Sequence, residues 1–86
     1  MKINIDDSSM TKTPNVYFPT SYFDVTKMAE ALINDIPIII NLTIVDYKTK
    51  LRIIDFICGV AYVTHAKRTL LEKSIYLFSP VKKSIR

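Results

Sequence analysis

The sequence predicts a small α/β (α+β) sandwich with the order β-α-β-α-β-β, in which two helices pack on a sheet of four to five strands. Two observations support this. Apolar residues recur with the 3.6-residue period of a helix in two segments, and short β-branched and aromatic runs lie around them. The chain has 86 residues, 49% of them hydrophobic, which suffices for one domain but leaves much of its surface uncovered. We therefore expect the domain to be dimeric.

The first strand and the first helix are expected within residues 15–35. Asn15-Val16-Tyr17-Phe18 is a short aromatic and β-branched run that stops at a proline, as a brief strand does. Thr20-Ser21 supplies an N-cap and Asp24 stands where a capping-box acid belongs, so a helix of about four turns should follow. Its apolar stripe consists of Val25, Met28, Ala29 and Leu32.

The second strand and the second helix are expected to be buried more completely. Residues 37–42 form a continuous, mostly β-branched run, which is typical of a strand covered on both faces. Asp46 is a suitable N-cap for a helix that runs to about Thr64. Between Ile53 and Val63 this helix is apolar almost all round, which indicates burial on two sides. In so small a domain, the second side has to come from another subunit.

A hairpin is expected to complete the sheet. His65-Ala66-Lys67-Arg68 is predicted to be a basic turn, and Thr69-Leu70-Leu71 and Ser74–Ser79 are predicted to pair around a tip at Glu72-Lys73. The core domain should therefore span residues 15–80. Residues 1–14 and 81–86 are expected to be a flexible N-terminal tail and a basic C-terminal tail.

Charge and composition limit the function classes. The net charge is +4, but residues 1–40 carry −2 (three lysines, five acids) and residues 41–86 carry +6 (nine Lys or Arg, three acids). The basic half suits an anionic partner or merely keeps an apolar chain soluble. One Cys, one His and one Gly disfavour a disulfide framework, a metal cluster and a glycine-rich phosphate loop, so we expect no metal and no cofactor. No secretion signal or membrane span is recognisable, which favours an intracellular protein.

Catalytic groups lack partners in the sequence. Cys58 lies among apolar residues, which favours an inert thiol, and His65 follows it by seven positions without a third orienting group. Arg52 and Asp55 are three positions apart on the second helix, so we predict a structural ion pair between them. These residues indicate a protein that is not an enzyme.

Gly59 is the informative residue of the second helix. A glycine inside a helix costs about 1 kcal/mol relative to alanine, so it usually marks either close approach of another backbone or the end of the helix. We favour close approach by a helix of a second subunit. The expected self-association contact consists of Phe56, Gly59 and Val60.

The last strand allows a different function. Tyr76 and Phe78 alternate with Ile75 and Leu77, so both aromatic rings should face one side of the sheet. If that side is open, the rings can stack on bases, form a subunit interface or line a peptide groove. The glycine-rich aromatic motif of RNA-binding domains is missing, so a small RNA-binding domain is only the alternative prediction.

Four stretches together resemble the SepF family of cell-division proteins, without gaps from about Val16 to Pro80. They are Pro19 followed by a capped helix, then Ile38–Leu42, Arg52–Gly59 and Ser74–Pro80. The specific part is the helix motif R-x-x-D-F-x-x-G at Arg52, Asp55, Phe56 and Gly59. The strand motifs look closest to cyanobacterial members, and the Ile- and Lys-rich composition is compatible with a plastid-encoded copy.

The resemblance implies a non-enzymatic scaffold that binds the C-terminal peptide of FtsZ, self-assembles into dimers and polymers, and acts in the cytoplasm at the division site, or in the stroma for plastid division. Family members usually carry an N-terminal amphipathic membrane helix, which residues 1–14 do not contain, so membrane contact should be weak or indirect. No nucleic-acid partner is expected. The family tends to place a basic residue where Leu70 stands. The expected FtsZ-peptide groove consists of Lys67, Arg68, Leu70, Tyr76 and Phe78.

Overall fold

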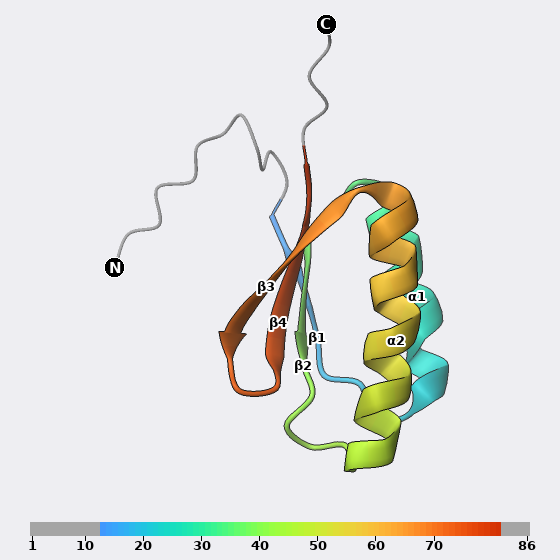
Figure 1. The fold of residues 1–86 in the computed structure, drawn as a ribbon, viewed down its shortest axis with the longest axis vertical. Coiled ribbons are helices and arrows are strands. Elements are labelled where there is room, and N and C mark those ends of the chain that lie inside the picture. The colour runs from blue at the N-terminus through green and yellow to red at the C-terminus, as the bar shows by residue number, and fades with distance from the viewer. Residues whose placement is uncertain (1–12, 82–86) are drawn as a thin grey trace, which may run out of the picture.

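Two helices cover one face of a four-stranded sheet in the computed structural model, which describes residues 13–81 (Figure 1). The predicted element order is confirmed, with a short 3-10 turn added ahead of the first helix. In chain order the elements are β1 (Asn15–Tyr17), η1 (Tyr22–Asp24), α1 (Val25–Ile33), β2 (Ile38–Asn41), α2 (Tyr47–Thr64), β3 (Ala66–Glu72) and β4 (Ile75–Pro80). Most of the two predicted tails lies outside the described residues.

The strands are arranged in the order β1-β2-β4-β3, so the sheet has the lower of the two expected strand numbers. β1 is parallel to β2, whereas β2–β4 and β4–β3 are antiparallel. Residues paired across neighbouring strands lie on the same face of a sheet. Ile38 pairs with Phe78 and Ile40 with Tyr76, and these residues face the helices. Ile39 pairs with Leu77 on the opposite face.

The core lies between the helices and the sheet. All four residues of the predicted α1 stripe are buried, as the helical period requires. From α2, the buried residues are spaced by four, so they form one narrow row along the helix. The core cluster consists of Val25, Met28, Ala31, Leu32, Ile38, Ile40, Leu42, Ile53, Ile57, Ala61 and Phe78.

The start of α1 differs in detail from the prediction. The carboxylate of Asp24 accepts hydrogen bonds from the backbone N–H groups of Thr20 (2.9 Å) and Ser21 (3.3 Å), so the expected cap is present. It opens the 3-10 turn η1, however, and α1 itself has only nine residues. The helix is therefore shorter than the four turns predicted, because the chain spends its first turn in the tighter helix.

α2 begins where it was predicted to begin, but the segment that follows its end differs from the prediction. Asp46 caps its start, since the carboxylate accepts a hydrogen bond from the N–H of Thr49 at 3.3 Å. His65 ends the helix in the left-handed conformation, with φ of 63°. One residue thus reverses the chain, and the predicted basic turn of residues 65–68 is wrong: Ala66 already begins β3.

The hairpin tip is also displaced by one residue. The turn falls at Lys73 and Ser74 rather than at Glu72 and Lys73, and Ser74 has φ of 66°. The β3–β4 register shifts between Leu70 and Glu72, which places an extra residue in β3 as in a β-bulge. A prediction that assumes strict alternation of side chains along the strand cannot include this extra residue.

The expectation that β2 is covered on both faces is wrong for the single chain. Ile38 and Ile40 are fully buried under the helices, whereas Ile39 is only partly buried. Both helices lie on the same side of the sheet (Figure 1). The central position of β2 between β1 and β4 is sufficient to select β-branched residues.

Candidate functional site

The outward side of α2 carries three residues of the sequence motif, together with Val63 from the next turn of the helix. Arg52, Phe56, Gly59 and Val63 are four, three and four positions apart, so they share one side of the helix. All four are exposed, opposite the buried row of this helix. We call these four residues the α2 stripe.

Gly59 lies in the middle of the α2 stripe, and the helix continues to Thr64. The alternative that Gly59 marks the helix end is therefore wrong. A Cβ added at Gly59 would meet nothing within 4 Å. No backbone among residues 13–81 accounts for the glycine. Contact with a second subunit at Phe56, Gly59 and Val60 stays a prediction, and Val60 is partly buried against the core.

Arg52 has a different partner from the one predicted. Its guanidinium carbon lies 4.1 Å from the centroid of the Tyr22 ring, a cation–π contact, and no ion pair joins it to Asp55 within residues 13–81. Tyr22 also makes edge-to-face contacts with Phe23 (6.3 Å between ring centroids) and Phe56 (6.2 Å). The guanidinium stacks on this cluster because η1 brings Tyr22 beside α2. Tyr22 and Phe23 were not predicted as site residues; the available signal for them was two adjacent aromatic residues within the capping box.

A second surface lies where β3 and β4 pass beside α2. Leu70 pairs with Tyr76 on the helix side of the hairpin, and Leu70 is 60% exposed. Arg68 lies on the same side, because its guanidinium Nη1 donates a hydrogen bond to the sulfur of Cys58 at 3.7 Å. We call Arg68, Leu70 and Tyr76 the hairpin patch.

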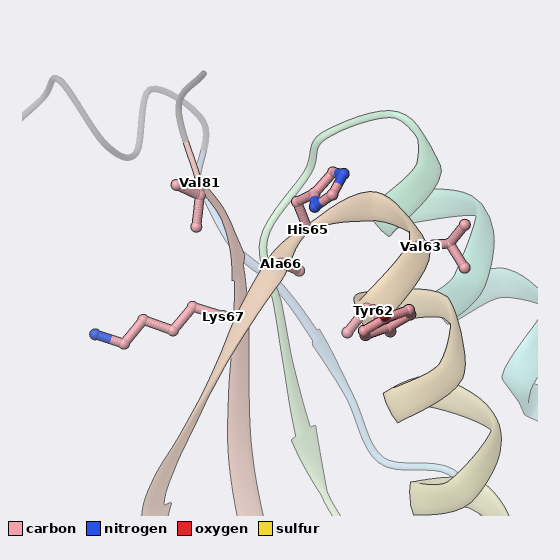
Figure 2. Close-up of a pocket in the computed structure, with 7 residues that line it drawn as sticks. Tyr62, Val63, His65, Ala66, Lys67 and Val81 are labelled. Carbon is pink, nitrogen blue, oxygen red and sulfur yellow. The ribbon is translucent and has the colours of Figure 1, made fainter. Parts of the chain in front are cut away.

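The hairpin patch contains three of the five residues predicted to form a peptide groove. Phe78 is only 2% exposed and belongs to the core, so its ring is not available to a ligand. Lys67 precedes Arg68 on β3 and points away from α2 (Figure 2). The alternation of β3 therefore separates the two cations that the sequence places side by side.

The aromatic platform of the RNA-binding alternative is not present. Tyr76 and Phe78 share one side of β4, as predicted, with ring centroids 6.4 Å apart. That side is the one covered by the helices, so the condition that it is open, on which stacking on bases depended, is not met. The helix-free face instead carries aliphatic side chains and a threonine in a row across the sheet: Val16, Ile39, Leu77 and Thr69.

The two candidate catalytic side chains, Cys58 and His65, have separate surroundings in the described part of the chain. Cys58 has Arg68 as its hydrogen-bonding neighbour, and His65 caps α2 at an exposed position. Residues 13–81 contain no group of three or more His, Cys, Asp or Glu side chains that could hold a metal ion. Among these residues, no helix has both the length and the hydropathy needed to cross a membrane.

The sequence is similar to curated cell-division proteins. The family model described as cell division protein SepF matches residues 15–85. A cell division protein SepF of Clostridium beijerinckii is 35% identical over 78 residues, which are 91% of this chain and 51% of that protein. A cell division protein SepF of Renibacterium salmoninarum is 31% identical over 78 residues, or 91% of this chain and 45% of that protein. The chain thus spans about half the length of these relatives.

The fold is similar to solved structures as well. A SepF-like protein from Archaeoglobus fulgidus superposes with a TM-score of 0.74 at 11% identity, over 85% of this chain and 90% of the other. A SepF-like protein from Pyrococcus furiosus gives a TM-score of 0.67 at 13% identity over the whole of both chains. The family match over residues 15–85, together with the sequence identity to curated members, shows that this chain belongs to the SepF family of cell division proteins.

Proposed function

We propose that this chain is a non-enzymatic scaffold of the division machinery, which binds the C-terminal peptide of FtsZ through the hairpin patch and self-associates through the α2 stripe. It would act in the cytoplasm at the division site, or in the plastid stroma if the gene is plastid-encoded. Family membership supports the cell-division role. The single observation that supports peptide binding is the hairpin patch.

The hairpin patch has the chemistry that a short peptide ligand needs. Leu70 offers an exposed apolar side chain, Tyr76 a partly buried ring beside it, and Arg68 a guanidinium at the rim. Apolar anchors with a few polar or charged groups around them are typical of peptide-binding surfaces. The contact between Arg68 and Cys58 holds the guanidinium against α2. The patch is thus bordered by the helix on one side.

Self-association is supported by the uncovered apolar surface of α2. Phe56 is 39% exposed and Val63 is 70% exposed, with the open space above Gly59 between them. A protruding ring one turn from a glycine can fit a second copy of the same surface, as isologous dimers require. Small residues also allow two helix backbones to approach closely.

The peptide part is tested by calorimetric titration of the full chain with a synthetic peptide of the FtsZ C-terminus from the same organism. We expect Tyr76→Ala to weaken binding at least about tenfold, which corresponds to the 1–2 kcal/mol typical of a contact residue. Arg68→Glu should weaken it similarly. Lys67→Glu is the matched control, because it makes the same charge change on the adjacent residue of β3, which faces away from the patch. Circular dichroism confirms folding of each variant.

Equal loss of binding in Arg68→Glu and Lys67→Glu would mean that net charge, and not the hairpin patch, attracts the peptide. An absence of binding by the folded wild-type chain would contradict the peptide-binding function.

A further inference from the structure

β3 is a free edge of the sheet. It stands last in the order β1-β2-β4-β3, so β4 pairs with one of its sides and no described strand pairs with the other. Alternate N–H and C=O groups of an antiparallel edge strand point outward and can pair with an additional strand. The other edge strand, β1, has only three residues, whereas β3 has seven.

Only the first part of β3 can accept a regular partner. The register shift between Leu70 and Glu72 bends the strand and interrupts the alternation of its outward groups. Ala66–Leu70 remains, five residues long, which is close to the usual length of a strand. The charged residues Lys67 and Arg68 fall within this segment.

A pocket opens at the start of that segment (Figure 2). It has a volume of about 710 Å³, and its walls include Tyr62, His65, Ala66, Lys67 and Val81. Tyr62 is 85% exposed and Val81 52% exposed, so apolar surface in the pocket is left uncovered. The pocket lies at the opposite end of the hairpin from the turn at Lys73.

Charge selects the kind of partner. The pocket is lined by one lysine and one histidine and by no acid, and Lys82, Lys83 and Arg86 follow Val81 in the sequence. Antiparallel pairing of β3 with β3 of a second copy would bring the two Lys67–Arg68 pairs close together, for example Arg68 opposite Arg68, and like charges on paired strands are destabilising. An acidic strand would instead be attracted to this edge.

We propose that the free edge of β3 binds an extended acidic peptide segment of another protein, which pairs with Ala66–Leu70 as an additional strand. One apolar side chain of the segment enters the pocket at Tyr62 and Val81, and its carboxylates face Lys67 and His65. Strand addition gives affinity through main-chain hydrogen bonds and specificity through side-chain pockets. This site uses the backbone edge and the side of β3 that carries Lys67, so it goes beyond the proposed FtsZ contact at the hairpin patch.

The test uses NMR titration of the full chain with a capped six-residue peptide of alternating Glu and Val. We expect amide shifts and slowed hydrogen exchange at residues 66–70, and weaker binding in Tyr62→Ala. Lys67→Glu should weaken binding about tenfold, from the loss of one attraction and the gain of one repulsion. Lys73→Glu is the matched control, since it makes the same change at the hairpin turn, and it should stay within about twofold.

Three results would overturn the proposal. They are equally tight binding of a peptide of alternating Lys and Val, amide shifts confined to the hairpin patch, and equal weakening of binding by Lys67→Glu and Lys73→Glu. Pairing of β3 between copies without peptide, seen as concentration-dependent exchange protection at residues 66–70, would also overturn it. Lys67→Gln removes the charge with less perturbation and should give an intermediate affinity.

Discussion

Arg52 holds its guanidinium carbon 4.1 Å from the centroid of the Tyr22 ring. The contact joins α2 to η1, two segments separated by α1 and β2, and Tyr22 contacts Phe56 on the same side. The arginine of the family motif is therefore engaged with an aromatic cluster at the margin of the α2 stripe. Its role in the single chain is to fix η1 against the helix.

We expect the Arg52–Tyr22 contact to contribute about 0.5–1 kcal/mol to the free energy of unfolding, as exposed cation–π pairs do. A double-mutant cycle with Arg52→Gln and Tyr22→Leu, measured by urea unfolding, isolates this coupling from the other contacts of Tyr22. The pair Arg52→Gln and Asp55→Asn serves as the control cycle. A larger coupling energy in the control cycle than in the Arg52–Tyr22 cycle would show that Arg52 interacts mainly with Asp55, and would contradict this assignment.

Gly59→Lys is expected to abolish assembly while leaving the domain folded. The position is open in the single chain, so folding tolerates a side chain there. In a helix–helix contact, the same side chain would bury an unpaired charge. Gly59→Ala should stabilise the single chain by up to about 1 kcal/mol through helix propensity, and weaken association by about 1–3 kcal/mol through overpacking.

Sedimentation of the wild type and Gly59→Lys provides the measurement, with circular dichroism as the folding check. Thr26→Lys is the matched control, because it adds the same charge at an exposed position of α1. If folded Gly59→Lys assembles as the wild type does, self-association does not use α2. The helix-free face with Ile39 and Leu77 would then be the surface to mutate next.

Acid should destabilise the fold through its two helix caps. Hydrogen bonds from the backbone of Thr20 and of Ser21 lower the pKa of Asp24, and those from the side chain and backbone of Thr49 lower the pKa of Asp46. A carboxyl group with a depressed pKa in the folded state contributes stability that is present above its unfolded pKa, about 4, and is lost as the pH falls through the folded value. The urea concentration at the midpoint of unfolding should therefore decrease as the pH falls below about 4. The double variant Asp24→Asn, Asp46→Asn should show a shallower drop, and identical pH profiles would contradict this assignment.

Binding to lipid vesicles is expected to be weak and electrostatic. Lys82, Lys83 and Arg86 each contribute about 1 kcal/mol near an anionic membrane surface, and salt screens this attraction. Co-sedimentation with anionic vesicles should be detectable at low salt and lost at high salt. Vesicles of neutral lipid serve as the control, and tight binding to them at high salt would show an apolar anchor.

Local patterns account for most of the elements. The capping acids Asp24 and Asp46 and the stripe around Met28 predict the two helices, because capping and helical periodicity act over only a few residues. The tip of the hairpin was predicted one residue too early. The left-handed conformations of His65 and Ser74 depend on where the chain must reverse, which local patterns do not specify. Strict alternation likewise cannot reveal the bulge after Leu70.

The sequence by itself determined the element order, the shared side of Tyr76 and Phe78, and the family. The tertiary structure alone decided which side of the sheet the helices cover, since alternation defines two faces but does not say which is buried. That choice placed Phe78 in the core and left Ile39, Leu77 and Lys67 on the helix-free face. It also gave Arg52 a ring instead of a carboxylate, because Tyr22 reaches α2 only when α1 packs beside it. Contacts between side chains far apart in the chain depend on how the elements pack, and local sequence patterns contain no information about that packing.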